Sequence, residues 1–240
     1  MEHFNNSLGI KLFADGADLK SMIEMASKPY ISGLTTNPTL MKKAGVSDYV
    51  KFAKEVIREI PDKPISFEVF SDELEEMKVQ AIKIASWGQN VNVKIPITNT
   101  KGINTSPVIR EITKLGVKVN ITAVMTLSQV SRVMLALDPG IECFISVFAG
   151  RIADTGVNPI PIMTDSLEEI KSNPSAQLIW ASPRELLNVF QAESIGCHII
   201  TATNDILKKL ELVGYDLDKF SLDTVKMFFN DAVEAGYTIP

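Results

Sequence analysis

The stretch VNVKIP, residues 91–96, alternates apolar and polar side chains as a β-strand does. Its three apolar residues Val91, Val93 and Ile95 share one parity, while Asn92 and Lys94 share the other. In a barrel of parallel strands, one parity faces the surrounding helices and the other faces the closed interior. The stretch therefore predicts a strand that places a lysine inside a barrel.

Seven further apolar runs alternate with segments of helical spacing, so the chain contains eight strand–helix units in about 200 residues. This order predicts an α/β fold, a (β/α)8 TIM barrel forming one domain over residues 1–240, with an additional C-terminal helix at about 222–235. A doubly wound open sheet is the alternative, because strand count alone does not show closure. The other predicted strands are KLFAD (11–15), GLTTN (33–37), ISFEVF (65–70), KVNITAV (118–124), ECFISVF (142–148), QLIWAS (177–182) and HIITAT (198–203).

Local motifs add detail to the connections between the strands. Thr126 with Gln129, and Ser182 with Glu185, have the spacing of capping boxes and predict two helix starts. Residues 154–174 are rich in Pro and Asn, which predicts a loop with a short helix.

Composition excludes several classes of protein. The formal net charge of -5 disfavours nucleic acid as a partner, because phosphate-binding surfaces are usually basic. No apolar run approaches the ~20 residues that span a bilayer, and the N-terminus does not resemble a signal peptide, so a cytoplasmic location without membrane association is expected. Two histidines leave little material for a metal site or a Ser-His-Asp triad, and neither a metal nor a cofactor is expected. Cys143 and Cys197 are expected to be buried free thiols.

Polar residues gather on the predicted interior parity, near the C-terminal ends of the strands where barrel enzymes place catalytic groups. Buried singly, each would cost several kcal/mol, so they must satisfy one another or a ligand. Each also has a structural interpretation. Lys94 is equally well explained as an ion-pair partner of Glu68 or Asp15, and Asn120 and Thr122 as interior hydrogen-bonding residues. Ser182 and Arg184 are explained as a helix cap and a solvated helix residue, although a helix start after the seventh strand is also a common phosphate site.

Five segments together resemble the signature segments of transaldolases and the related small fructose-6-phosphate aldolases. The resemblance extends from about residue 11 to 210, with the motifs in family order. The segments are GLTTNP (33–38), NVKIP (92–96), VNITAVMT (119–126), ISVFAGRIAD (145–154) and WASPR (180–184).

The resemblance implies a class I, Schiff-base transaldolase of carbohydrate metabolism and the pentose phosphate pathway. It assigns Lys94 as the Schiff-base lysine and Asp15 as the acceptor of the proton from the C4 hydroxyl of the substrate. It assigns Glu68 and Thr122 to a catalytic water during imine formation and hydrolysis. Residues expected to bind the sugar or its terminal phosphate are Thr36, Asn37, Asn120, Ser146, Phe148, Arg151, Ser182 and Arg184.

Two departures from the family pattern leave alternatives open. Gly16 stands where Ser or Thr usually follows the catalytic aspartate, which affects either a sugar contact or a local hydrogen bond. Pro183 lies within the Ser-x-Arg context, where it either fits the first position of a helix or reshapes the anion pocket.

The leading hypothesis is transfer of dihydroxyacetone from a ketose phosphate to an aldose. The alternatives are a transaldolase for 6-deoxy-6-sulfofructose, a fructose-6-phosphate aldolase that releases dihydroxyacetone, and a non-catalytic barrel that serves as a binding protein. Phe148 favours the transferase, because similar aldolases carry tyrosine at this position. Relatives of this size form rings through the C-terminal helix, so a homo-oligomer is expected.

Overall fold

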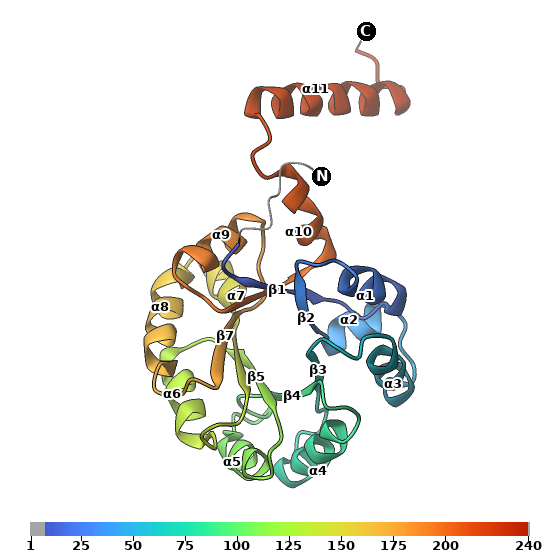
Figure 1. Ribbon diagram of the computed structural model, residues 1–240. Coiled ribbons are helices and arrows are strands. Elements are labelled where there is room, and N and C mark those ends of the chain that lie inside the picture. Colours follow the sequence, from blue (N-terminus) through green and yellow to red (C-terminus); the bar gives the residue numbers. More distant parts are fainter. Residues whose placement is uncertain (1–7, 240) are drawn as a thin grey trace. The chain divides into compact units, whose positions relative to one another are not determined.

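The computed structural model describes residues 8–239 and contains one closed barrel of eight parallel strands. Each strand pairs with the next in sequence, and β8 closes the ring against β1 (Figure 1). This confirms the predicted TIM barrel and excludes the open sheet. The strands are β1 Lys11–Asp15, β2 Ile31–Thr35, β3 Ile65–Glu68, β4 Val91–Pro96, β5 Val119–Val124, β6 Cys143–Val147, β7 Ala176–Trp180 and β8 Ile199–Thr203.

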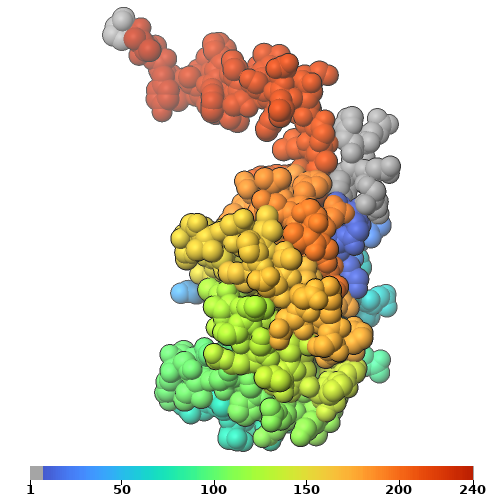
Figure 2. Space-filling model, turned by 90° about the vertical axis from the view of Figure 1, so that its left-hand side faces the viewer, coloured from blue at the N-terminus to red at the C-terminus, as the bar shows by residue number. Residues whose placement is uncertain are grey.

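Helices surround the ring of strands, and the space-filling view shows their side chains forming a continuous surface over one face of the barrel (Figure 2). No helix within the described residues is long and apolar enough to cross a membrane. The helices are α1 Leu19–Ala26, α2 Pro38–Lys43, α3 Tyr49–Glu59, α4 Leu74–Ala85, α5 Ser106–Lys114, α6 Leu127–Ala136, α7 Ala149–Asp154, α8 Pro159–Ile170, α9 Leu187–Ser194, α10 Asn204–Lys208, the 3-10 helix η1 Lys209–Leu212, and α11 Leu217–Glu234.

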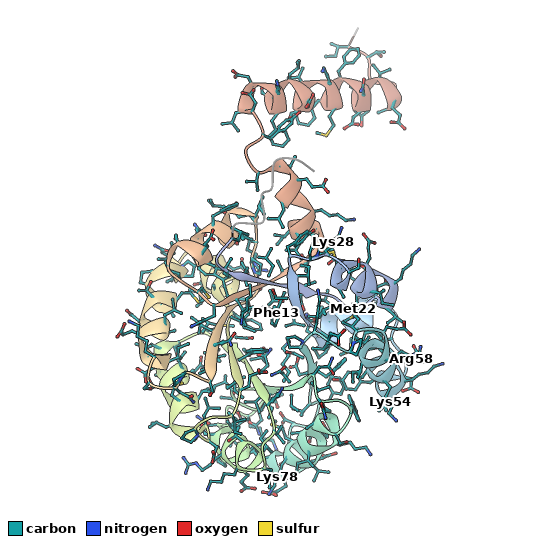
Figure 3. The ribbon with its side chains drawn as sticks, in the orientation of Figure 1. Phe13, Met22, Lys28, Lys54, Arg58 and Lys78 are labelled. Carbon is teal, nitrogen blue, oxygen red and sulfur yellow. The ribbon has the colours of Figure 1, made fainter. Side chains whose placement is uncertain are left out.

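The barrel interior has an apolar cluster formed mainly by β1, β6, β7 and β8. Phe13 lies inside the ring, whereas Lys54 and Arg58 point outward from α3 (Figure 3). The ring of Phe13 meets that of Phe144 edge to face, with centroids 5.6 Å apart. Gly33 makes room for it, because a Cβ there would lie 2.5 Å from the Phe13 ring. Ile179, Ala181 and Ile199 complete this cluster, and Phe148 packs against it.

Three local predictions need correction, while the Thr126–Gln129 capping box at the start of α6 is confirmed. Ser182 does not cap a helix: its backbone has a φ of 60°, and α9 begins only at Leu187. The side chain of Asn188 holds this loop by accepting hydrogen bonds from the backbone N–H groups of Arg184 and Glu185.

The Pro-rich segment 154–174 contains a full helix, α8, rather than a loop with a short helix. Asn158 caps this helix by accepting a hydrogen bond from the Ile160 backbone N–H. Pro159 stands at the first helical position, where the missing N–H would have no intrahelical partner. The composition that predicted a loop therefore marks a helix start.

The C-terminal part of the chain, from Lys208, forms a compact unit of its own. Its helix α11 begins at Leu217, five residues before the predicted start, because Asp216 caps it by accepting a hydrogen bond from the Lys219 backbone N–H. None of the α11 residues is buried. That both units make one domain stays a prediction.

Candidate active site

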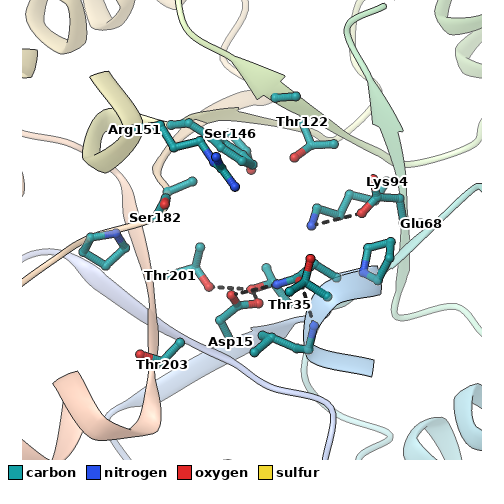
Figure 4. A pocket seen from close by; sticks show the side chains of 18 of the residues that line it. Asp15, Thr35, Glu68, Lys94, Thr122, Ser146, Arg151, Ser182, Thr201 and Thr203 are labelled. Atoms are coloured by element: carbon teal, nitrogen blue, oxygen red, sulfur yellow. Dashed lines mark hydrogen bonds and ion pairs between the residues drawn. The ribbon is translucent and has the colours of Figure 1, made fainter. Parts of the chain in front are cut away.

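A cavity of about 420 Å³ opens among the C-terminal ends of the strands (Figure 4). All four predicted catalytic residues line this cavity, together with six of the predicted binding residues. The register explains the proximity, since Glu68 pairs with Lys94 across β3 and β4, and Pro96 pairs with Thr122 across β4 and β5. The predicted residues in the lining are Asp15, Asn37, Glu68, Lys94, Thr122, Ser146, Phe148, Arg151, Ser182 and Arg184.

Lys94 reaches the cavity from the interior side of β4 and is only 6% exposed. Its Nζ lies 3.4 Å from the Glu68 Oε2 and donates a hydrogen bond of 2.8 Å to the backbone carbonyl of Thr36. The end of β3 is fixed in turn by Tyr49, whose hydroxyl donates to the Glu68 carbonyl at 2.9 Å. The amine is thus held at a defined place beside a carboxylate and at the edge of open space.

Asp15 ends β1 and is held by two donors from the neighbouring strand end. The Thr35 hydroxyl donates to Asp15 Oδ1 at 2.8 Å, and the Asn37 amide donates to Asp15 Oδ2 at 3.2 Å. Asn37 is itself fixed because its Oδ1 caps α2, accepting from the Leu40 backbone N–H at 2.9 Å. Burial raises the pKa of Asp15 above its usual range, and the charge of Lys94 with the two hydrogen bonds opposes this rise.

The pKa of Glu68 is also raised above its usual range, again because the carboxyl is buried. Burial raises the pKa of its carboxyl, the nearby Lys94 ammonium lowers it, and the charge of Asp15 raises it further. A carboxylate with a raised pKa is a stronger base than one in water. Two such carboxyls flanking one amine give the cavity the groups needed for repeated proton transfer.

Thr122 has a buried hydroxyl with no hydrogen-bond partner among the described residues. Such a group is costly to leave unsatisfied, which points to a ligand or water in the cavity. The next residue, Ala123, has a φ of 60°, and the pairing of β5 with β6 shifts register between Ile121 and Val124. Left-handed backbone in a residue other than glycine is strained and is found preferentially at functional sites.

Two arginines and a serine line the opposite side of the cavity. Arg184 donates from Nε to Asp154 Oδ1 at 2.9 Å and also contacts Asp154 Oδ2 through a terminal nitrogen. The guanidinium carbon of Arg151 lies 6.0 Å from the centre of the Phe148 ring. The strained Ser182 lies close to α7, because a Cβ on Gly150 would come within 1.5 Å of the Ser182 carbonyl oxygen.

Two predicted binding residues do not reach the cavity surface. Thr36 is fully buried, contacts Lys94 through its carbonyl, and donates from its hydroxyl to the Ser66 carbonyl at 3.0 Å. Asn120 is also fully buried, with its amide donating to the Ser66 hydroxyl at 2.9 Å and accepting from the Ser146 hydroxyl at 2.7 Å. Both therefore support the lining residues rather than line the cavity.

Gly16 also lies outside the cavity lining. A Cβ at this position would point toward Met22 of α1, at a comfortable 3.8 Å from its Cγ. The packing around Gly16 therefore leaves ordinary van der Waals space for a Cβ and does not require glycine.

Sequence reasoning missed two threonines of β8 that line the cavity, Thr201 and Thr203. The signal was present, because both fall on one parity of HIITAT, but two threonines in an apolar strand did not stand out. Thr201 is 6% exposed, and its hydroxyl lies 2.5 Å from that of Thr35.

The described residues contain no group of three or more His, Cys, Asp and Glu side chains placed to hold a metal ion. Cys143 and Cys197 are buried and unpaired, as predicted. Burial raises the pKa of the Cys197 thiol to about 12 and also raises that of Cys143, so neither thiol is an activated nucleophile.

Comparison with known proteins places these features in a family. Residues 12–239 match the family described as Transaldolase/Fructose-6-phosphate aldolase. Similar proteins include a "probable transaldolase" of Thermoanaerobacter sp. (strain X514), 32% identical over 90% of this chain and 95% of the relative. Another, from Brucella ovis, is 32% identical over 96% of this chain and 100% of the relative.

Solved structures support the fold alone. A Coccidioides immitis protein described as belonging to the dihydrodipicolinate synthase family superposes with a TM-score of 0.60 at 12% identity, covering 97% of this chain and 80% of that one. A designed cube-shaped protein cage built from fused oligomeric domains gives a TM-score of 0.54 at 13% identity, covering 95% and 80%.

Proposed function

Because the chain belongs to the transaldolase/fructose-6-phosphate aldolase family, we propose that it moves a dihydroxyacetone unit from a ketose phosphate to an aldose through a Schiff base on Lys94. The observation that carries the proposal is the position of the Lys94 amine. It faces the cavity between Glu68, at 3.4 Å, and the Asp15 network, opposite two arginines. An isolated structural ion pair would need neither the cavity nor the second carboxylate.

The first half of the reaction forms the imine. The neutral amine of Lys94 attacks the C2 carbonyl of the ketose, and the carbinolamine oxygen leaves as water after protonation. Glu68 is the group that takes up and returns protons here, since it lies nearest the amine. The unpartnered hydroxyl of Thr122 supplies a hydrogen-bonding site for the departing, and later the attacking, water.

The second half breaks the C3–C4 bond. Asp15 takes the proton from the C4 hydroxyl, the C4–O bond becomes a carbonyl, and the electron pair of the C3–C4 bond moves into the iminium. The products are an aldehyde, which leaves, and a neutral enamine of dihydroxyacetone on Lys94. An acceptor aldose then reverses these steps, and hydrolysis of the new imine releases the longer ketose. Asn37 and Ser146, which line the cavity, hold hydroxyls of the three-carbon unit.

The terminal anion of the substrate binds at Arg151, Ser182 and Arg184. The planar guanidinium suits bidentate contact with a tetrahedral anion, and Asp154 holds that of Arg184 in place. We expect Arg184→Gln to raise KM for fructose 6-phosphate by about 10–100-fold, as loss of a charge-assisted hydrogen bond does. KM for unphosphorylated fructose should change much less. Equal effects on both sugars would remove Arg184 from the anion site.

The acceptor requirement separates a transferase from a lyase. Phe148 in the cavity wall favours the transferase, because it offers no hydroxyl to a water or sugar. The test is release of glyceraldehyde 3-phosphate from fructose 6-phosphate, with and without an added aldose phosphate. We expect at most one release per active site without acceptor and sustained turnover with it. Rapid sustained release without acceptor would instead identify a fructose-6-phosphate aldolase.

A sulfonate can take the place of the phosphate in the same pocket, which keeps 6-deoxy-6-sulfofructose as the second candidate substrate. Both anions are tetrahedral oxyanions that a guanidinium binds through two oxygens. Specificity is the ratio of kcat/KM for the two ketoses, measured under the same conditions. A ratio favouring the sulfonate would change the donor substrate but leave the roles of Lys94 and Asp15 intact. The cytoplasmic location and the pentose phosphate pathway stay predictions.

We also propose that the protein is a homo-oligomer in which a second copy covers α11. All large apolar residues of this helix are exposed, including Phe220 at 45%, Phe228 at 62% and Phe229 at 67%. An apolar helix surface of this extent is typical of protein–protein contacts. Sedimentation of the purified protein tests this, and a species of 26.4 kDa at micromolar concentration would contradict it.

A further inference from the structure

The hydroxyl of Thr201 belongs to a short chain of hydrogen bonds that ends on Asp15. We propose that Thr201 is a positioning residue for Asp15, acting through Thr35 to hold the carboxylate in its proton-accepting state and orientation. This inference rests on the proposed function, because it concerns the group that receives the C4 hydroxyl proton. Thr201 does not need to touch the reacting atoms itself.

The direction of the hydrogen bonds follows from counting protons. The Thr35 hydroxyl lies 2.8 Å from Asp15 Oδ1 and 2.5 Å from the Thr201 hydroxyl, but it carries one proton. An ionised carboxylate only accepts, so Thr35 donates its proton to Asp15. Thr201 must then be the donor to Thr35. The O–H dipoles of the two hydroxyls are therefore aligned toward Asp15, and each hydrogen bond polarises the next.

The fold explains why a residue of β8 reaches a residue of β2. These strands flank β1 on either side, with Asp15 paired with Thr35 in β2, and Phe13 with Thr201 in β8. Both threonines are almost completely buried, at 2% for Thr35 and 6% for Thr201. The close-up view shows the two hydroxyls directed toward each other beside Asp15 (Figure 4). Thr35 has its acceptor oxygen occupied by Thr201, so its own proton stays available to Asp15.

This arrangement acts on a carboxyl whose surroundings work against ionisation. Burial raises the pKa of Asp15, whereas Lys94, Thr35 and Asn37 lower it. The other charged groups around the cavity are Glu68, Arg151 and Arg184. The hydroxyl chain from Thr201 through Thr35 supports the ionised carboxylate in the step in which Asp15 accepts the C4 proton. Its loss should therefore raise the pH below which Asp15 is protonated and unable to accept the C4 proton.

The test is the pH profile of kcat/KM for transfer from fructose 6-phosphate to a four-carbon aldose phosphate. We expect Thr201→Val to move the acidic limb of this profile to higher pH by roughly half a unit to one unit. This is about the change in pKa that the loss of one hydrogen bond causes. Thr201→Ser keeps the hydroxyl and should restore the limb. Thr203→Val is the matched control, because Thr203 lines the same cavity and pairs with Asp15 across β8 and β1, but its hydroxyl makes no hydrogen bond to a described residue. Thr203→Val can change KM, but the acidic limb of its pH profile should coincide with that of the wild type.

A second measurement does not depend on turnover. The 13C resonance of the Asp15 carboxyl, assigned by its loss in Asp15→Asn, should titrate at higher pH in Thr201→Val than in the wild type. Unmoved titration and an unmoved acidic limb would overturn the inference. A wild-type protein that turns over no ketose would refute the proposed function instead, and the carboxyl titration would still decide on Thr201. If Thr201→Val does not fold, Thr201→Ala removes the same hydroxyl with a smaller side chain.

Discussion

Replacing Lys94 with methionine should lower kcat by at least about 1,000-fold, the scale expected when the nucleophile of a covalent mechanism is lost. Methionine fills a similar volume but has no amine, so no imine forms and the ketose keeps its C3–C4 bond. Borohydride added with fructose 6-phosphate should reduce the wild-type iminium to a stable adduct on Lys94. Intact-mass measurement should find this adduct in the wild type and none in Lys94→Met.

Lys94→Arg separates loss of the nucleophile from loss of the charge. The methionine variant removes the cation beside Glu68 and Asp15, and both carboxyls then gain protons more readily because burial already raises their pKa. Arginine keeps a positive charge in the site but forms no Schiff base with a ketose. Both variants should therefore be inactive, with thermal unfolding showing whether each is folded. Wild-type turnover in either folded variant would refute the Schiff-base mechanism.

The fold could be predicted from the sequence because a barrel repeats a single pattern. The strand VNVKIP was predicted with its observed bounds, as was KLFAD, because alternation of side chains on parallel strands is a local property. Closure required the structure, since no local feature of β1 or β8 records that the two strands pair. The errors fell on connections. The composition of residues 154–174 predicts a loop with a short helix, but Pro159 begins the 12-residue helix α8. Ser182 is predicted to cap a helix, but its backbone is left-handed.

The residues of the candidate site could be predicted from two features, the side of each strand on which they lie and the order of the family's motifs along the chain. Lys94, Asp15, Glu68 and Thr122 face one cavity because each lies on the interior parity near a strand end. Parity does not tell which interior residue reaches open space. Asn120 lies on the same side of β5 as Thr122 but one layer deeper in the barrel. There its amide donates a hydrogen bond to the Ser66 hydroxyl and accepts one from the Ser146 hydroxyl.

Contacts between distant strands were equally invisible in the sequence. Arg184 is expected from the sequence to bind the substrate's phosphate, but its pairing with Asp154, at the end of α7, could not be predicted. The link from Thr201 to Thr35 joins residues 166 positions apart. Such pairings depend on the stagger of the barrel strands, which sets the residues that share a layer. The roles of single residues therefore come from the family, whereas their mutual support comes from the three-dimensional arrangement.

Asp15→Asn should separate the two halves of the reaction more cleanly than any other substitution. Asparagine has the shape of aspartate but accepts no proton, so C3–C4 cleavage should slow by about 100- to 10,000-fold, the usual contribution of a general base. Imine formation uses Lys94 and Glu68, which the substitution leaves in place. Borohydride should therefore still trap fructose 6-phosphate on Lys94 in this variant, and the adduct should carry all six carbons of the ketose.

The mass of the trapped adduct shows whether the C3–C4 bond was cleaved before borohydride reduced the iminium. In the wild type, cleavage precedes trapping in part of the molecules, so adducts of three and six carbons should both occur. In Asp15→Asn, blocked cleavage should leave the six-carbon adduct alone. Glu68→Gln is the matched control, because it alters a carboxyl on the opposite side of Lys94 and should slow formation of every adduct. If Asp15→Asn instead gave the three-carbon adduct at the wild-type rate, another group would take the C4 proton, and the assignment of Asp15 would be wrong while that of Lys94 stood.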